Sequence, residues 1–243
     1  MRIFIMEDYA AMSRKAAELM AAQILLHPDS VLGLATGSTP IPAYEMLVQW
    51  YERGVIDFDR VRTFNLDEYV GIDHKNPLSY HAFMQEHLFS KVNLRPENTH
   101  LPSGHSAEAG LRYDRAIHEA GGIDIQLLGI GRNGHIGFNE PAKDFTFGTH
   151  VVTLTQDTIE ANARFFKSPD DVPRQAISMG IGNIMAAKCV VLVATGADKA
   201  DAVYKTLCGP ITPQVPASIL QLHPCCVILA DHEAGALVER ESR

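Results

Sequence analysis

The sequence contains no apolar run that approaches the roughly 18 residues a membrane-spanning helix needs. Its first apolar stretch is interrupted by Glu7 and Asp8, so it is not typical of a secretion signal. Positive charge is also scarce, because 21 Lys and Arg stand against 29 Asp and Glu and leave a net charge of −8. Such a surface has no general attraction for nucleic acid or anionic lipid. We therefore expect a cytoplasmic protein with no membrane or nucleic-acid partner, in which an anionic ligand needs a local positive site.

Cysteine is scarce, and no two of the four cysteines have C-x-x-C spacing; they are Cys189, Cys208, Cys225 and Cys226. Three of them lie in or beside apolar runs, which predicts buried free thiols in a reducing compartment. Two histidines, His81 and His87, fall within a helical pattern. We expect them at the helix surface and at the edge of the core, rather than around a metal ion. The sequence also has no linker, low-complexity tract or long repeat.

Short apolar segments alternate with helical patterns along the whole chain. The segments expected to be strands cover residues 2–6, 31–35, 61–66, 125–130, 150–154, 176–179, 190–195 and 225–230. Between them apolar residues recur at helical spacing, and Ser106 and the pair Gly121–Gly122 suit the start and end of one helix. This alternation predicts an α/β fold with a doubly wound, mostly parallel sheet and helices on both faces. A single domain over residues 1–243 is the simplest organisation.

The most distinctive stretch covers residues 125–141 and reads IQLLGIGRNGHIGFNEP. Its apolar beginning predicts a strand buried on both faces. The glycines that follow argue against a longer strand, and Pro141 argues against a helix that includes it. His135 and Glu140 are therefore expected in a loop at the carboxyl end of a central strand, which is where ligands bind in open α/β sheets.

Three glycines in this stretch, Gly129, Gly131 and Gly134, spell the G-x-G-x-x-G fingerprint of dinucleotide-binding proteins. That fingerprint needs a helix that begins at the third glycine, so that its amides contact the pyrophosphate. Here Gly137 and Pro141 lie where the helix would run, and no acidic residue follows at a convincing strand end. We therefore do not expect a dinucleotide site.

A turn with the sequence A-T-G follows two of the predicted strands. In the first, ATGSTP at residues 35–40, Pro40 suits the first helical turn and leaves Ser38 or Thr39 near the N-cap. Hydroxyls and backbone amides at a helix start favour an anion, most often phosphate, although an ordinary capped turn is the alternative. In the second, ATGADK at residues 194–199, the helix dipole disfavours Lys199 unless that lysine faces an anion. A solvated Lys199 is the simpler alternative.

Two adjacent carboxylates, Asp67 and Glu68, follow another predicted strand in the sequence FNLDEY. Neighbouring residues of an extended chain point in opposite directions, so one carboxylate could enter a cleft while the other is solvated or salt-bridged. A carboxylate in the cleft would be a candidate for moving protons. An ordinary helix-capping acid is an equally good alternative.

Together these stretches resemble the glucosamine-6-phosphate deaminase family over nearly the whole chain. The motifs that carry the resemblance are LGLATGSTP, FNLDEYVG, GIGRNGHIGFNEP, TLTQDTIEANARFF, ATGADKA and LQLHP. The resemblance implies a modified doubly wound (Rossmann-like) sheet. It also implies conversion of glucosamine 6-phosphate and water into fructose 6-phosphate and ammonia, by ring opening, aldose–ketose isomerisation and deamination. The family acts in cytoplasmic amino-sugar catabolism with no catalytic metal or redox cofactor.

The resemblance also implies roles for individual residues. Asp67 would move a proton between C2 and C1 of the opened sugar, while His135, oriented by Glu140, would handle the ring oxygen. The residues expected to hold the phosphate are Thr36, Gly37, Ser38, Thr39, Arg164 and Lys199, with Arg164 on a helix that could close over the sugar. Many family members have Asp at the position of Asn133. Because Asn carries no negative charge, Glu140 is expected to be the only anion beside His135.

Two alternatives share this fold: 6-phosphogluconolactonases, which are hydrolases, and non-enzymatic sugar-phosphate sensor domains of transcription regulators. We expect lactonases to lack the pair FNLDEY and GHIGFNEP. The sensors need a DNA-binding module, and no helix-turn-helix precedes the first predicted strand.

Some members of the family are hexamers that N-acetylglucosamine 6-phosphate activates. Their effector site uses basic residues where this chain has His150 and Val152, and an aromatic residue in a longer C-terminal extension. This chain has no aromatic residue between Tyr204 and Arg243. We therefore expect a monomer or small homo-oligomer that this effector does not activate.

Overall fold

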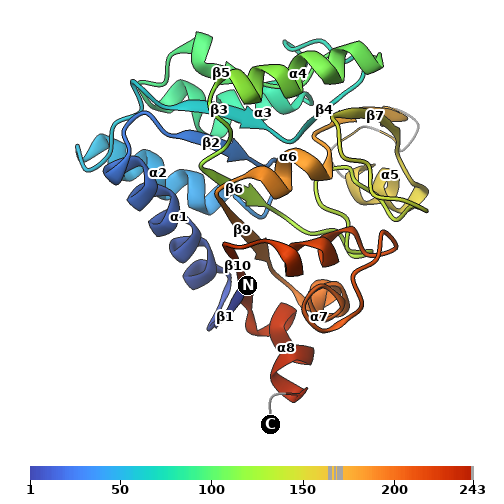
Figure 1. Ribbon diagram of the computed structural model, residues 1–243. Helices are drawn as coiled ribbons and strands as arrows, with labels where there is room; N and C mark the ends of the chain where they lie inside the picture. The colour runs from blue at the N-terminus through green and yellow to red at the C-terminus, as the bar shows by residue number, and fades with distance from the viewer. Residues whose placement is uncertain (164–165, 167, 169–171, 242–243) are drawn as a thin grey trace.

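The computed structural model describes residues 1–163, 166, 168 and 172–241 (Figure 1). Its strands are β1 (Arg2–Met6), β2 (Val31–Leu34), β3 (Arg62–Asn65), β4 (Asp67–Tyr69), β5 (Thr99–His100), β6 (Ile125–Leu128), β7 (His150–Thr153), β8 (Gln175–Ser178), β9 (Cys189–Ala194) and β10 (Cys226–Asp231). Its α-helices are α1 (Tyr9–Leu26), α2 (Ile41–Glu52), α3 (Tyr80–His87), α4 (Ala107–Glu119), α5 (Gln156–Ala163), α6 (Ile181–Ala186), α7 (Ala200–Cys208) and α8 (His232–Glu241). Short 3₁₀-helices are η1 (Phe89–Lys91), η2 (Pro96–Asn98), η4 (Ala197–Lys199) and η5 (Pro216–Leu222). Every segment predicted to be a strand forms one.

Seven strands form a parallel sheet in the order β1-β10-β9-β6-β2-β3-β5. From β2 the chain moves outward through β3 to β5, then returns to β6 beside β2 and moves the opposite way through β9 to β10. The direction of winding therefore reverses between β2 and β6. At such a point a crevice opens outside the carboxyl ends of the strands. The predicted doubly wound α/β fold is confirmed.

Helices cover both faces of this sheet, as predicted (Figure 1). One core lies under α1, α2 and α3, and a second lies under α4, α6, α7 and α8. Successive residues of a strand point into alternate cores: in β9, Val191 and Val193 join the first, whereas Val190 and Leu192 join the second. Because neither face is solvated, the central strands are nearly continuous apolar runs.

Strands β4, β8 and β7 form a separate antiparallel sheet, which the sequence did not predict. Leu66 joins the two sheets: its N–H donates to the Leu34 carbonyl (3.1 Å), and its own carbonyl accepts from the Met179 N–H (2.6 Å). The segments at 150–154 and 176–179 were correctly predicted as extended. Their apolar pattern does not encode which strands they pair with, and so the second sheet was missed.

The prediction of buried free thiols is correct for only one of the four cysteines. Cys226 is buried and Cys189 is half-buried, but Cys208 and Cys225 are exposed. Cys208 is the last residue of α7, and Cys225 precedes the first residue of β10, so apolar neighbours in sequence do not cover either thiol. His81 and His87 are half-buried on α3, and His87 packs against Phe83 with a ring-centroid distance of 4.4 Å. Within the described ranges, no three His, Cys, Asp or Glu side chains are placed to hold a metal ion, and no helix is long and apolar enough to cross a membrane.

Candidate active site

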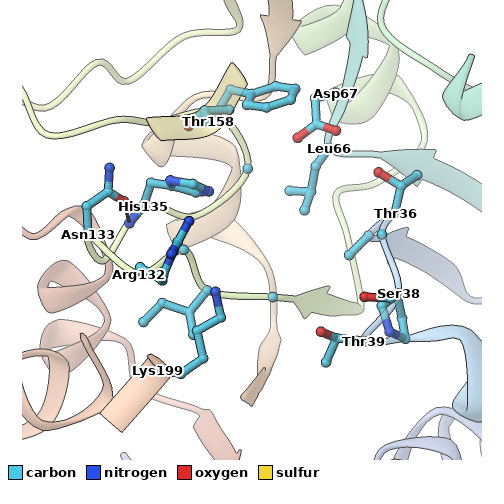
Figure 2. A pocket seen from close by; sticks show the side chains of 18 of the residues that line it. Thr36, Ser38, Thr39, Leu66, Asp67, Arg132, Asn133, His135, Thr158 and Lys199 are labelled. Carbon is cyan, nitrogen blue, oxygen red and sulfur yellow. Dashed lines mark hydrogen bonds between the residues drawn. The ribbon is translucent and has the colours of Figure 1, made fainter. Parts of the chain in front are cut away.

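A cavity of about 580 Å³ opens at the carboxyl ends of β9, β6, β2 and β3, four neighbours in the main sheet. The turn that follows each strand supplies part of its lining. The predicted site residues that line the cavity are Thr36, Gly37, Ser38, Thr39, Asp67, Asn133, His135 and Lys199. Figure 2 shows Thr36, Ser38 and Thr39 on one side of the cavity, Asn133, His135 and Lys199 on the opposite side, and Asp67 at the top of the view. Glu140 lies behind His135, and Arg164 is outside the described residues.

The two A-T-G turns share one backbone feature. Gly37 and Gly196 both adopt positive φ, at 97° and 89°, a conformation that disfavours any residue with a β-carbon. The first turn is fixed from below by Tyr44, whose hydroxyl donates to the Ala35 carbonyl (2.6 Å). The second is fixed by the Asp231 carboxylate, which accepts from the Gly196 N–H (3.0 Å) and the Thr195 hydroxyl. Both turns are therefore held in shape by groups behind the cavity.

The helix after the first turn begins later than predicted. Pro40 itself is the N-cap of α2, and among the described residues no side chain caps this helix. The fixed φ of proline suits the start of a helix, and so Ser38 and Thr39 precede it and line the cavity instead of capping it. Lys199 follows the second turn as the N-cap of α7, and its side chain, 23% exposed, also lines the cavity, 3.4 Å from Asp198.

The Glu140 carboxylate is held by three side chains. Oε2 accepts from Asn133 Nδ2 (2.8 Å) and lies 3.3 Å from His135 Nδ1, an ion-pair contact rather than an aligned hydrogen bond. Oε1 accepts from the Thr158 hydroxyl on α5. Burial raises the pKa of Glu140, but the contacts with His135, Thr158 and Asn133 outweigh it and lower the pKa to about 2. Glu140 is therefore an anion beside the imidazole at neutral pH.

Asn133 contributes something that an aspartate could not. Its amide nitrogen donates to Glu140, while its Oδ1 accepts from the His135 backbone N–H (3.2 Å). A carboxylate at this position could only accept, and it would lie against a second carboxylate. In this chain the residue supports the anion next to His135, and Glu140 is the anion that contacts the ring.

The two adjacent carboxylates point in opposite directions, as predicted, but neither is solvated. Glu68 is buried and accepts from three backbone N–H groups, those of Tyr69 (2.9 Å), Tyr80 (3.0 Å) and His81 (3.0 Å). The expectation that this partner is solvated or salt-bridged is wrong, because the free amides at the start of α3 satisfy its charge.

Asp67 enters the cavity, where burial and, secondarily, the charge of Glu68 raise its pKa to about 8. The loop after β6 passes close to this carboxylate. A β-carbon on Gly137 would lie 3.5 Å from Asp67 Oδ2, an ordinary van der Waals distance, so this residue lies beside the carboxylate. The positive φ of Gly137, 57°, is the feature that favours glycine at this position. Asp67 and the His135 loop therefore belong to one site.

Arg132 and Thr158 are among the lining residues that were not proposed from the sequence. Arg132 is exposed and extends into the cavity near Lys199 (Figure 2). A cation within the glycine-rich loop GIGRNGH was the available signal. Thr158 had no such signal, because a threonine inside a helix is unremarkable until the fold brings it to Glu140.

A protein-family profile described as glucosamine-6-phosphate isomerases/6-phosphogluconolactonase matches residues 7–228. The chain belongs to this family. The curated glucosamine-6-phosphate deaminase of Clostridioides difficile (strain 630) is 55% identical over 239 residues, which cover 97% of this chain and 96% of the relative. That of Thermoanaerobacter pseudethanolicus (strain ATCC 33223 / 39E) is 51% identical over 244 residues, with 99% and 96% covered.

Solved structures agree with this membership. A monomeric glucosamine-6-phosphate deaminase matches with a TM-score of 0.94 and 42% identity, over 98% of this chain and 100% of that one. A 6-phosphogluconolactonase from Thermotoga maritima matches with a TM-score of 0.74 and 19% identity over 95% and 99%, which shows a shared fold alone. The predicted resemblance to the deaminases is confirmed.

Proposed function

We propose that this protein is an enzyme that converts glucosamine 6-phosphate and water into fructose 6-phosphate and ammonia, in amino-sugar catabolism. Identity above 50% to full-length deaminases supports this activity. The main support is that three groups meet at one cavity. They are the carboxyl group of Asp67, whose pKa is raised, the pair His135 and Glu140, and Lys199 together with the hydroxyl groups of the turns. The cavity volume of about 580 Å³ lies within the range of small-molecule sites.

The phosphate group binds between the two A-T-G turns. Thr36, Ser38 and Thr39 offer hydroxyls, Gly37 leaves the backbone of the turn accessible, and Lys199 supplies charge from across the cavity. A phosphate held there provides binding energy remote from the carbons that react. The family resemblance implies that Arg164 is a further ligand of the phosphate.

Ring opening is the task of His135. The Glu140 anion lies 3.3 Å from Nδ1 and fixes the orientation of the imidazole, so His135 is placed to give a proton to the ring oxygen and take one back. Asn133 and Thr158 hold Glu140 in place for this step.

Isomerisation is the task of Asp67. As a carboxylate it removes the proton from C2 of the opened sugar, and as the acid it returns a proton to C1, through an enediol-like intermediate. A pKa of about 8 makes Asp67 a stronger base than an ordinary aspartate and keeps both forms accessible near neutral pH. Both steps are proton transfers by side chains of this chain. The shift leaves an imine at C2; water adds to that carbon, the C2–N bond breaks, and ammonia leaves, which gives a ketone at C2.

We further propose that residues 1–243 act as one catalytic domain in the cytoplasm, as a monomer or small homo-oligomer. The 42% identical deaminase described as monomeric supports the small assembly. His150 and Val152, where an effector site would need fixed cations, lie on β7, and His150 Nδ1 is 3.0 Å from the Gly148 carbonyl.

The test is to incubate purified protein with glucosamine 6-phosphate and measure ammonia and fructose 6-phosphate, with 6-phosphogluconolactone hydrolysis followed in parallel. We expect the two products in equal amounts and no acceleration of lactone hydrolysis. Rapid lactone hydrolysis without ammonia would instead assign the cavity to a lactonase. Tight binding of either sugar phosphate without turnover would indicate a sensor.

A further inference from the structure

Two free cysteines face each other at the amino ends of two neighbouring strands of the main sheet. Cys189 begins β9, and Cys225 lies directly before β10, the strand paired with β9 in parallel. Cys226 pairs with Val190, and the Val190 N–H donates to the Cys225 carbonyl (2.9 Å), so Cys189 and Cys225 are opposite one another. Their sulfur atoms are 3.2 Å apart, with the Cys225 thiol directed at Cys189 Sγ.

The two thiols differ in accessibility. Cys225 is exposed, so a small oxidant can reach its sulfur. Cys189 is half-buried, and burial, followed by its contact with Cys225, raises its pKa to about 12. Cys189 is therefore the slower of the two to react with a free peroxide, and the first oxidation falls to the exposed Cys225. The other two cysteines do not share this arrangement: Cys226 is buried, and Cys208 is exposed at the end of α7.

We propose that Cys189 and Cys225 are a peroxide-sensitive pair that forms a reversible intramolecular disulfide. In the first step the Cys225 sulfur attacks a peroxide: an S–O bond forms, the O–O bond breaks, and water or an alcohol leaves. Cys225 is thereby oxidised to a sulfenic acid and the peroxide is reduced. In the second step Cys189 Sγ attacks the sulfenic sulfur. The S–S bond forms, the S–OH bond breaks, and the hydroxide leaves as water with the Cys189 proton.

Proximity favours the second step over further oxidation. A disulfide has an S–S length of about 2.05 Å, so sulfur atoms at 3.2 Å need only a small movement to bond. The exposed position of Cys225 leaves space for that movement and for a thiol reductant that would reverse it.

The position of the pair predicts what the disulfide does. Cys189 and Lys199 are separated by the length of β9, six residues or about 20 Å of strand, so the cross-link forms away from the cavity. It closes residues 189–225 into a loop, which restricts the unfolded chain and should raise the midpoint of thermal unfolding by about 5–10 °C. We expect enzymatic activity to change by less than about twofold, since the cavity geometry is untouched.

The experiment treats the full chain with hydrogen peroxide, alkylates the remaining thiols and maps tryptic peptides by mass spectrometry. Cleavage separates the peptide 189–199 from the peptide 206–240, which carries the other three cysteines. The same treatment is applied to the variants Cys189→Ser, Cys225→Ser and Cys208→Ser. The last of these is the matched control, because Cys208 is an exposed thiol outside the pair.

We expect the wild type and Cys208→Ser to give the two peptides joined, with the mass of two hydrogen atoms lost, and dithiothreitol to separate them. Cys189→Ser and Cys225→Ser should give no joined peptide. Addition of two or three oxygen atoms to Cys225 without a cross-link would overturn the proposal. A cross-link that persists in Cys225→Ser, or a disulfide-linked dimer that disappears only in Cys208→Ser, would overturn it as well.

Discussion

Replacing Asp67 with Asn should abolish most of the activity and stabilise the fold, by an amount that grows as the pH rises from 3.8 to about 8. The amide keeps the shape of the side chain but cannot accept the C2 proton. Turnover should therefore fall by roughly 10²-fold or more, while binding of a substrate analogue changes by less than about tenfold, because the phosphate site is unchanged.

The stability gain follows from the pKa of Asp67, about 8 in the folded protein against an ordinary value of 3.8. Below pH 3.8 the carboxyl is protonated in both states and has no effect on the free energy of unfolding. As the pH rises, the unfolded chain releases the proton first, which favours unfolding until the folded protein releases it too, near pH 8. Over this range the free energy of unfolding falls by about 1.4 kcal/mol per pH unit. Because the fall ends near pH 8, the upper limit of the loss between pH 5 and pH 9 is about 4 kcal/mol.

Urea unfolding of the wild type and Asp67→Asn at several values between pH 5 and pH 9 measures this cost. The variant should gain stability relative to the wild type as the pH rises, and the gain should level off above about pH 8. Replacing the exposed Asp144 with Asn is the control, for which no growing gain is expected. A difference between Asp67→Asn and the wild type that stays constant with pH would show that the carboxylate is not buried as argued. Near wild-type turnover would assign the base to another group.

Three other variants or conditions test the remaining roles. His135→Gln should slow turnover of the cyclic substrate more than exchange of the C2 proton in an open-chain form, and equal losses would remove the separation of roles. Thr158→Val removes the hydroxyl that donates to Glu140 and leaves a carboxylate oxygen unpaired. This should reduce kcat by roughly tenfold with little change in KM. Thr158→Ser keeps the hydroxyl and should retain activity. The substrate dependence of the rate should be hyperbolic with or without N-acetylglucosamine 6-phosphate; a sigmoidal curve that this effector makes hyperbolic would contradict the argument from His150 and Val152.

Six of the seven strands of the main sheet could be predicted from sequence, because both faces of the sheet are covered and its central strands are mostly apolar. The edge strand β5 was missed, because its two residues, Thr99 and His100, carry no apolar pattern. The strands β4, β7 and β8 carry a weaker pattern. The segment DEY is polar by composition, yet all three of its residues are buried, because Glu68 is satisfied by amides from α3, more than ten residues away. A pattern within one segment cannot reveal a partner that another segment supplies.

The same limit applies to the cavity. Residues in turns after strands were found from sequence, since parallel strands bring their carboxyl ends to one edge. The recurrence of A-T-G also reflects a real structural repeat, the positive φ of Gly37 and Gly196. The support of Glu140 by Thr158 depends on where α5 packs, and no local spacing encodes that contact.

The two carboxyl groups of the site have pKa values displaced in opposite directions, and that difference explains why each suits its proposed task. Asp67 is buried and lies near the charge of Glu68, so its pKa rises to about 8 and it can exchange a proton near neutral pH. Glu140 is also buried, but His135, Thr158 and Asn133 hold its charge, so its pKa falls to about 2 and it remains an anion throughout. A group that must shuttle a proton and a group that must only orient and stabilise a histidine need opposite environments. If the donors that hold Glu140 were placed around Asp67 instead, the pKa of Asp67 would fall and that of Glu140 would rise. Ring opening and isomerisation would then both fail, although each carboxyl group would still be present.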